Sequence, residues 1–337
     1  MEQVTTIGLD IAKNVFQLHG VDAAGNVLLR KQLRRADVLR FFSGLSPCLV
    51  GMEACATAHY WARELAKLGH TVRLMPPAYV KPYVKRGKTD AADAEAIAEA
   101  VTRPTMRFVA VKSAEQQAVL MLHKVRDLLV RQRTMLINAL RGHLAEFGII
   151  AARGPGGVTA AIVALHEMQD SMPVLARVAL HGLVDQLRIV RDEVVKVEKR
   201  IVAQHRANDA SRRLATIPGI GPITASAIAA AVPDATLFKS GRQFAAWLGL
   251  TPRTHSSGGR SDSSVTKQGD GYIRRLLVIG ATAVIRLARQ DNASKSWAAK
   301  LLERKSARLV SVALANKTAR IAWALLARNQ SYVAPAM

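Results

Sequence analysis

The sequence is poor in cysteine and in aromatic residues, and it has far fewer acidic than basic residues. Its two cysteines, Cys48 and Cys55, lack a metal-binding spacing and indicate a reducing compartment rather than a disulfide scaffold. The N-terminus does not resemble a signal peptide, and no apolar run approaches the roughly 20 residues that a membrane span needs. We therefore expect a cytoplasmic protein without a membrane partner.

The charge of the chain points to a polyanionic partner. Lys and Arg number 48 against 25 Asp and Glu, a formal net charge of +23 over 337 residues. A globular protein this basic repels itself, and positive charge spread along the whole chain favours nucleic acid over a membrane surface. From Thr251 to Met337 there are 15 basic and four acidic residues, so this part is expected to contribute strongly to binding.

The first part of the chain, residues 1–112, has the pattern of an α/β layer fold with a mixed sheet. Three β-rich runs come first, and alternating helix and strand patterns follow them. The predicted strands are 4–9, 15–21, 26–33, 48–54 and 71–75, and the predicted helices are 36–45 and 57–68.

The middle part, residues 113–208, is expected to be helical. Apolar residues recur at three- and four-residue steps over 113–147 and again from Leu183 to Ile201, with a Gly-rich break at 154–157 between the two stretches. These stretches predict either an antiparallel, coiled-coil-like arm that supports dimerisation or two core helices of a bundle. The pattern alone does not decide between them. Residues 209–337 are expected to form a helical C-terminal domain.

Four acidic residues form the most informative group in the first part. Asp10 and Glu53 end predicted strands, and Asp90 and Asp93 lie three apart at the start of a helix, so they share one helical face. Carboxylates that converge above a sheet edge are suited to Mg²⁺, which can stabilise a phosphoryl transfer. Alternatively, Asp10 caps a turn, and Asp90 and Asp93 complement a helix dipole. Glu53 needs a partner in either case, because its segment is otherwise suited to burial.

Two motifs in the C-terminal part are suited to phosphate binding. Residues 217–222 (IPGIGP) resemble a helix–hairpin–helix, in which Gly219 and Gly221 would let the backbone approach a phosphate; the alternative is an ordinary turn between packed helices. The hydroxyl-rich loop 254–264 can supply a nucleophile, but composition alone selects no particular serine. Basic residues in and around this loop are candidate nucleic-acid contacts: Arg253, Arg260, Lys267, Arg274 and Arg275.

Taken together, these motifs resemble the DEDD transposases of bacterial insertion sequences, of the insertion-sequence 110/1111 type. The order of the four acids matches that family, and the resemblance extends over about residues 4–328. The matching segments are GMEA at 51–54, PP at 76–77, KTDAAD at 88–93, IPGIG at 217–221 and FAAWLGLTPR at 244–253. The resemblance implies an RNase H/RuvC-like domain at 1–112 and a transposase domain with a catalytic serine at 209–337.

The resemblance also implies a mechanism and partners. Asp10, Glu53, Asp90 and Asp93 would hold Mg²⁺ as catalytic acids, and Ser257 would attack DNA to form a phosphoserine intermediate, with Ser256 as the neighbouring alternative. A homodimer or homotetramer, an active site assembled between protomers, and guidance by a structured non-coding RNA are further implications. Two other functions stay open. One is a Mg²⁺-dependent Holliday-junction-resolvase-like nuclease that uses water, and the other is a non-enzymatic DNA-binding protein.

Overall fold

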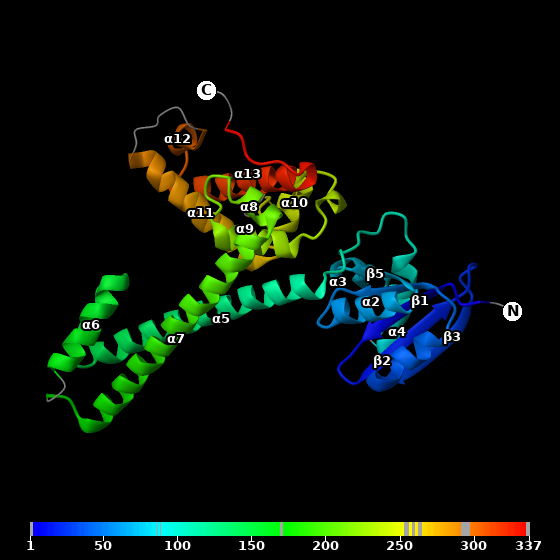
Figure 1. The fold of residues 1–337 in the computed structure, drawn as a ribbon, viewed down its shortest axis with the longest axis horizontal. Coiled ribbons are helices and arrows are strands. Elements are labelled where there is room, and N and C mark those ends of the chain that lie inside the picture. The colour runs from blue at the N-terminus through cyan, green and yellow to red at the C-terminus, as the bar shows by residue number, and fades with distance from the viewer. Residues whose placement is uncertain are drawn as a thin grey trace. The chain divides into compact units, whose positions relative to one another are not determined.

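The computed structural model (Figure 1) describes residues 3–85, 87, 89–168, 171–252, 256–257, 260–261, 265–290 and 297–334. The chain divides into two compact units. Unit 1 comprises Met1–Gln117 with Val232–Leu237, and unit 2 comprises Ala118–Ala231 with Phe238–Met337. The three-part division at 112/113 and 208/209 stays a prediction.

Unit 1 contains a five-stranded mixed sheet in the order β3-β2-β1-β4-β5. The first three strands are antiparallel neighbours, and β4 and β5 run parallel to β1. All five strands predicted from the sequence are therefore confirmed, two of them with the predicted bounds and three with ends shifted by one or two residues. Their bounds are Thr6–Ile11 (β1), Val15–Val21 (β2), Val27–Arg34 (β3), Leu49–Glu53 (β4) and Thr71–Met75 (β5).

The alternation of side chains along these strands builds a different core on each face of the sheet. On one face, residues such as Leu9, Phe16 and Met52 are fully buried against α1 (Val38–Ser43) and α2 (Ala58–Lys67). On the other face, α4 (Asp90–Val101) packs Ile97 and Val101 around Met75. The sheet is thus the middle layer of three. Short elements lead into these helices: η1 (Arg35–Asp37), α3 (Pro77–Val80) and η2 (Lys81–Tyr83).

Helix α4 lies unusually close to β1. A Cβ atom on Gly8 would be 2.1 Å from the carbonyl oxygen of Ala94 and 2.4 Å from the amide nitrogen of Ala98. Only glycine fits at this point of β1, because any side chain would collide with the helix backbone. The helix that carries Asp90 and Asp93 therefore packs directly on the strand that carries Asp10.

Unit 2 is helical, and two long helices extend from its shorter ones (Figure 1). The structure confirms both long helices, as α5 (Ala114–Ala145) and α7 (Val174–Ala207). The predicted apolar stripe of α7 is buried from Leu187 to Ile201. The Gly-rich break, however, is the start of a further helix, α6 (Pro155–Glu167), because proline is favoured at the first helical position. An oligomerisation role for these helices stays a prediction.

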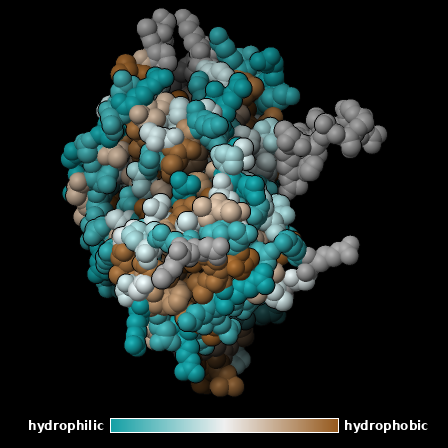
Figure 2. Space-filling view, turned by 90° about the vertical axis from the view of Figure 1, so that its right-hand side faces the viewer, coloured by the Kyte–Doolittle hydropathy of each residue, from teal (hydrophilic) through white to brown (hydrophobic). Residues whose placement is uncertain are grey.

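The rest of unit 2 consists of shorter helices and a small two-stranded hairpin. Among the described residues, one helix, α13 (Ala307–Arg328), is long and apolar enough to cross a membrane by length and composition, which corrects the expectation that no segment comes near that length. It carries Lys317 and Arg320 and packs on α10 and α11, as a core helix does. On the face drawn in Figure 2, hydrophilic residues are interspersed with small hydrophobic patches. The bounds are Asp209–Leu214 (α8), Pro222–Ala231 (α9), Gly241–Trp247 (α10), Ser256–Ser257 (β6), Arg260–Ser261 (β7), Gly271–Gln290 (α11), Trp297–Leu302 (α12) and Ala307–Arg328 (α13); η4 (Ala235–Leu237) belongs to unit 1.

Candidate active-site residues

Asp10 and Glu53 occupy equivalent positions on neighbouring parallel strands. Leu9 pairs with Met52 in the β1–β4 register, so each acid is the next residue beyond this pair. Adjacent strands are about 4.8 Å apart, and side chains two residues apart point to the same face. Both carboxylates are therefore on the face of the sheet that α4 covers, and both residues are half-buried.

The pKa of the Cys55 thiol responds to the negative charge of these two acids. Burial raises the pKa of this thiol, and the negative charges of Glu53 and Asp10 raise it further, against a backbone hydrogen bond that lowers it. Both carboxylates act on the same thiol, two residues after β4 ends. The end of β4 is thus a point of concentrated negative charge, which a cation would stabilise.

Asp90 and Asp93 are in the first turn of α4. Asp90 is exposed and Asp93 half-buried, and the side chain of Thr89 caps the helix by accepting a hydrogen bond from the amide of Ala92 at 3.2 Å. This position suits acids that complement a helix dipole as well as acids that hold a metal.

The fit of these residues to a metal ion is partial. Within the described ranges, no three or more His, Cys, Asp or Glu side chains gather closely enough to hold a metal ion. The oxygen donors of Asp10 and Glu53 are of the kind that Mg²⁺ takes, and α4 places two further carboxylates on the same face of the sheet. The four acids carry oxygen donors of the kind that Mg²⁺ binds, and they belong to the same face of the sheet. A full ligand set requires Asp90 or Asp93 to come closer to Asp10 and Glu53.

The predicted serine is on a hairpin in unit 2. Ser257 ends β6 and pairs with Arg260 of β7. Below this pair the hairpin is closed by a bridge between Pro252 and Val265 and by a backbone hydrogen bond from Thr266 to Thr251 of 3.0 Å. The side chains of Ser256, Ser257 and Arg260, and all of Arg253, lie outside the described part of the structure.

Two of the predicted nucleic-acid contacts have partners inside the protein. Arg274 donates hydrogen bonds to the carbonyl oxygens of Leu248, at 2.9 Å, and Gln268, at 2.8 Å, and so ties together the two chain segments that lead to the hairpin. Arg275 forms an ion pair with Asp127 of α5. Arg274 thus stabilises the base of the hairpin. Lys267 is exposed, and its contact with nucleic acid stays a prediction.

The Gly-rich turn before α9 contains one glycine with a packing role. A Cβ atom on Gly219 would be 3.1 Å from the carbonyl oxygen of Gly280 in α11, and Gly219 has φ +86°. This contact favours the interpretation of Gly219 as part of an ordinary turn between packed helices. Gly221 is exposed with open space around it and stays a candidate for phosphate contact.

Sequence reasoning missed a polar centre around His123 in unit 2. This side chain is 2% exposed, and its ring nitrogens are 3.2 Å from the hydroxyl of Tyr272 and 3.1 Å from that of Ser226. Burial and, to a smaller extent, the positive charge of the nearby Arg126 lower the pKa of His123 to about 4. The ring is therefore neutral in the folded protein. No signal in the sequence marks it, because its partners are 103 and 149 residues away.

Sequence reasoning also missed a group of basic and aromatic side chains along α13. Arg242, Lys317 and Arg320 line a groove together with Trp297 and Trp323. Lys317 and Arg320, the two basic residues in the middle of the largely apolar stretch 307–328, are the signal that could have identified it.

Comparisons with known proteins agree with this picture of an acid-bearing mixed sheet joined to a basic helical unit. Residues 7–149 match a family model for transposases with the DEDD domain of the IS110 type, and residues 211–297 match the transposase IS116/IS110/IS902 family. The "Probable family 20 transposase" of Pseudomonas aeruginosa is 52% identical over 98% of both chains. The transposase for insertion sequence element IS1328 of Yersinia enterocolitica is 41% identical over 96% of this chain and 97% of the relative. The transposase for IS1111A of Coxiella burnetii is also 41% identical, over 98% and 92%.

The chain belongs to the IS110/IS1111 family of insertion-sequence transposases. It is an enzyme that cleaves and rejoins DNA. Its DEDD domain implies an RNase H-like fold, with which the mixed sheet of unit 1 agrees.

Proposed function

We propose that this transposase uses a two-part active site, in which Asp10, Glu53, Asp90 and Asp93 hold Mg²⁺ and Ser257 is the nucleophile. The observation that carries the proposal is the equivalent placement of Asp10 and Glu53 at the ends of adjacent strands. When bound, Mg²⁺ would offset the negative charge of the scissile phosphate. Asp90 and Asp93, in the first turn of α4, would complete its ligand set.

The serine step conserves the energy of the phosphodiester bond. The Ser257 oxygen forms a bond to phosphorus, and the bond between phosphorus and one sugar oxygen breaks. The serine proton is lost to a base, and the sugar oxygen takes up a proton and leaves as a hydroxyl. The reverse reaction, with a hydroxyl of another DNA end, rejoins the strand and frees the serine. Water cannot replace the serine here, because hydrolysis would leave no activated phosphate.

Trapping of the covalent intermediate tests this mechanism. Labelled substrate DNA with Mg²⁺ should give a protein–DNA adduct that survives denaturing electrophoresis. Ser257→Ala should bind DNA but form no adduct and no recombinant product, and the matched control Ser256→Ala should retain activity. The opposite result would move the nucleophile by one residue. If both variants recombine fully, the serine mechanism fails, and a resolvase-like reaction with water or a DNA 3′-hydroxyl as the nucleophile takes its place.

We further propose that the enzyme is a homodimer or homotetramer that associates through α5. Met121, Val125, Leu128 and Met135 are 63%, 39%, 49% and 69% exposed, and they lie on one face at the steps of a coiled-coil seam. Leu128→Glu with Met135→Glu should shift the protein toward smaller species in analytical ultracentrifugation. Ile150→Glu, at an 82% exposed residue off this face, is the control. An unchanged distribution for the double variant would exclude this interface.

DNA is the substrate, and we propose a structured guide RNA as a second partner in the cytoplasm. The net charge of +23 supports a large phosphate-binding surface. Binding should weaken steeply with salt, because each phosphate contact releases counterions. RNA that co-purifies with the protein should be one discrete species with paired and looped regions. A heterogeneous smear that moderate salt removes would contradict guidance by RNA.

A further inference from the structure

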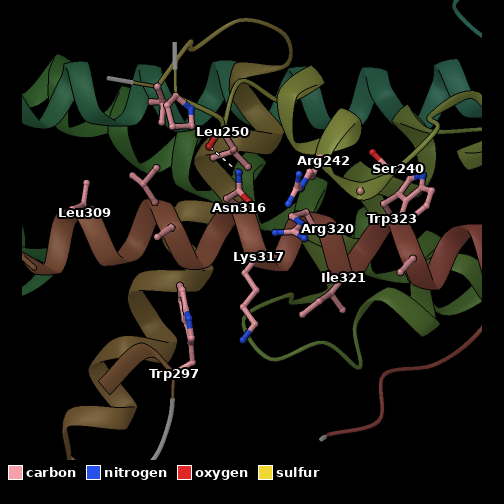
Figure 3. A pocket seen from close by; sticks show the side chains of 16 residues that line it. Ser240, Arg242, Leu250, Trp297, Leu309, Asn316, Lys317, Arg320, Ile321 and Trp323 are labelled. Atoms are coloured by element: carbon pink, nitrogen blue, oxygen red, sulfur yellow. Dashed lines mark hydrogen bonds between the residues drawn. The ribbon is translucent and has the colours of Figure 1, made fainter. Parts of the chain in front are cut away.

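A groove of about 930 Å³ runs along α13 in unit 2, with walls from α10, α12 and the base of the serine hairpin (Figure 3). This volume is within the roughly 300–1,000 Å³ of typical ligand sites. The described residues that line the groove include three cations and two indole rings and no acid. The side chains that matter here are Arg242, Trp297, Lys317, Arg320 and Trp323.

Two arginines meet at one point of the groove. A Cβ atom on Gly241 would be 3.1 Å from both the Cα and the carbonyl oxygen of Arg320, so α10 begins in backbone contact with α13. The next residue, Arg242, therefore stands beside Arg320, and Figure 3 shows the two guanidinium groups turned toward each other. Among the described residues, neither arginine forms an ion pair with an acid. Two adjacent guanidinium groups of this kind match the geometry and charge of a phosphate.

Aromatic surface lies in the same groove. Trp297 is 43% exposed, and the Lys317 amine is 4.8 Å from the centroid of its ring. Trp323 lines the groove farther along α13. Cations that follow a backbone, interleaved with aromatic rings on which bases stack, are typical of sites for single-stranded nucleic acid. Bases inside a duplex are already stacked and cannot present a face to an indole.

The groove adjoins the hairpin of Ser257. Leu250, Pro252 and Val265, at the base of that hairpin, form part of its wall, and the Asn316 amide donates a 3.0 Å hydrogen bond to the carbonyl oxygen of Leu250. The cations that line the groove, with no acid among the described lining residues, favour an anionic occupant. We propose that the groove binds an unpaired stretch of a DNA strand, with phosphate at Arg242 and Arg320 and base at Trp297. The inference rests on the proposed function, in which this hairpin acts on DNA.

Oligonucleotide binding by the full-length chain tests the groove separately from the serine chemistry. The probes are a labelled single strand of about 10 nucleotides, the duplex of the same sequence and the corresponding RNA. All are titrated against the Ser257→Ala protein, with fluorescence anisotropy as the readout at one ionic strength. We expect Trp297→Ala in this background to weaken single-strand DNA binding about tenfold and to leave duplex binding unchanged. Trp297→Phe should recover most of the affinity, since a ring remains.

The arginine pair needs a charge-matched control. Arg242→Gln with Arg320→Gln should weaken single-strand DNA binding about tenfold more than Arg286→Gln with Arg289→Gln, which removes two exposed cations that do not line the groove. Far-UV circular dichroism and the melting temperature verify the fold of each variant. Equal losses for both double variants, equal losses for single strand and duplex, or a loss confined to the RNA probe would each overturn the proposal. None of these outcomes depends on whether Ser257 is the nucleophile.

Discussion

Asp10 and Glu53 stand on strands that are hydrogen-bonded on both sides, in a sheet with packed helices on both faces. Ser257, by contrast, stands on a strand of two residues, in a hairpin fastened at its base by Arg274 and by the bridge between Pro252 and Val265. The acids are held by register and burial, whereas the serine is held by a few polar contacts. The difference suits the two proposed roles: a metal site benefits from well-positioned donors, and a nucleophile that attacks and is later released benefits from a support that can adjust.

The largest expected effect is the loss of DNA cleavage when one of the four acids is replaced. Asp10→Asn should lower DNA cleavage by roughly a thousandfold or more, because several kcal/mol of metal-based charge stabilisation are lost. The variant should stay folded, since it removes repulsion between two adjacent carboxylates. Cleavage rates and melting temperatures measure the two effects. Glu64→Gln, at an acid on α2 that pairs only with Lys67 among the described residues, is the matched control and should cleave normally. Normal strand transfer by Asp10→Asn would remove the acids from the mechanism.

The next prediction tests how strictly the sheet positions α4. Gly8→Ala would place a methyl group 2.1 Å from the carbonyl oxygen of Ala94, so the helix must move. We expect a loss of about 3 kcal/mol of stability together with a loss of cleavage, because α4 carries Asp90 and Asp93. Gly142→Ala, in an exposed part of α5 with open space around it, should instead be neutral or stabilise by about 0.5–1 kcal/mol. Thermal denaturation separates the two, and equal behaviour would show that the contact at Gly8 is not required.

A third prediction concerns the pH dependence of unit 2. The pKa of His123 is about 4 in the folded protein and about 6.5 in an unfolded chain, so between these values the unfolded chain binds more protons. Its contribution to stability is present above pH about 6.5 and is lost as the pH falls toward 4, by up to about 3 kcal/mol. His123→Gln should flatten the dependence of the melting temperature on pH in this window. His205 in unit 2 and His19 in unit 1, whose pKa values burial also lowers, contribute to the dependence that remains. An unchanged slope in the variant would mean that the ring can be protonated without unfolding.

The smallest expected effect concerns Arg274 at the base of the hairpin and its neighbour Arg275. Arg274→Ala removes a guanidinium bound to two carbonyl oxygens and should cost about 2 kcal/mol, together with much of the recombinant product. Arg275→Ala breaks an exposed ion pair and should cost less than about 1 kcal/mol. Urea denaturation and product yield compare the two neighbours. A larger loss for Arg275→Ala would show that the contact with α5, rather than the anchoring of the hairpin, matters more.

The strands and the long helices could be read from the sequence because their patterns are local. Alternating apolar residues mark a strand, and three- and four-residue steps mark a helix, whatever packs against them. The helix over 155–167 was missed because its Gly and Pro residues suggest a break. The roles of Arg274 and Gly219 could not be predicted either. Arg274 binds the carbonyl oxygen of Leu248, 26 residues away, and the turn at Gly219 packs against Gly280 of α11. No spacing rule in the sequence encodes such contacts.

By itself the sequence identified the features to which the proposal assigns the chemistry: four acids in a set order, a hydroxyl-rich segment after Pro252, and a large excess of positive charge. Only the tertiary structure decided that Asp10 and Glu53 are side by side, that the close contact at Gly8 brings α4 onto the same face, and that Arg242 and Arg320 meet across two helices. The physical reason is that residue type sets charge, donor atoms and local backbone preference. Proximity between distant residues depends instead on strand register and on how closely two backbones can approach.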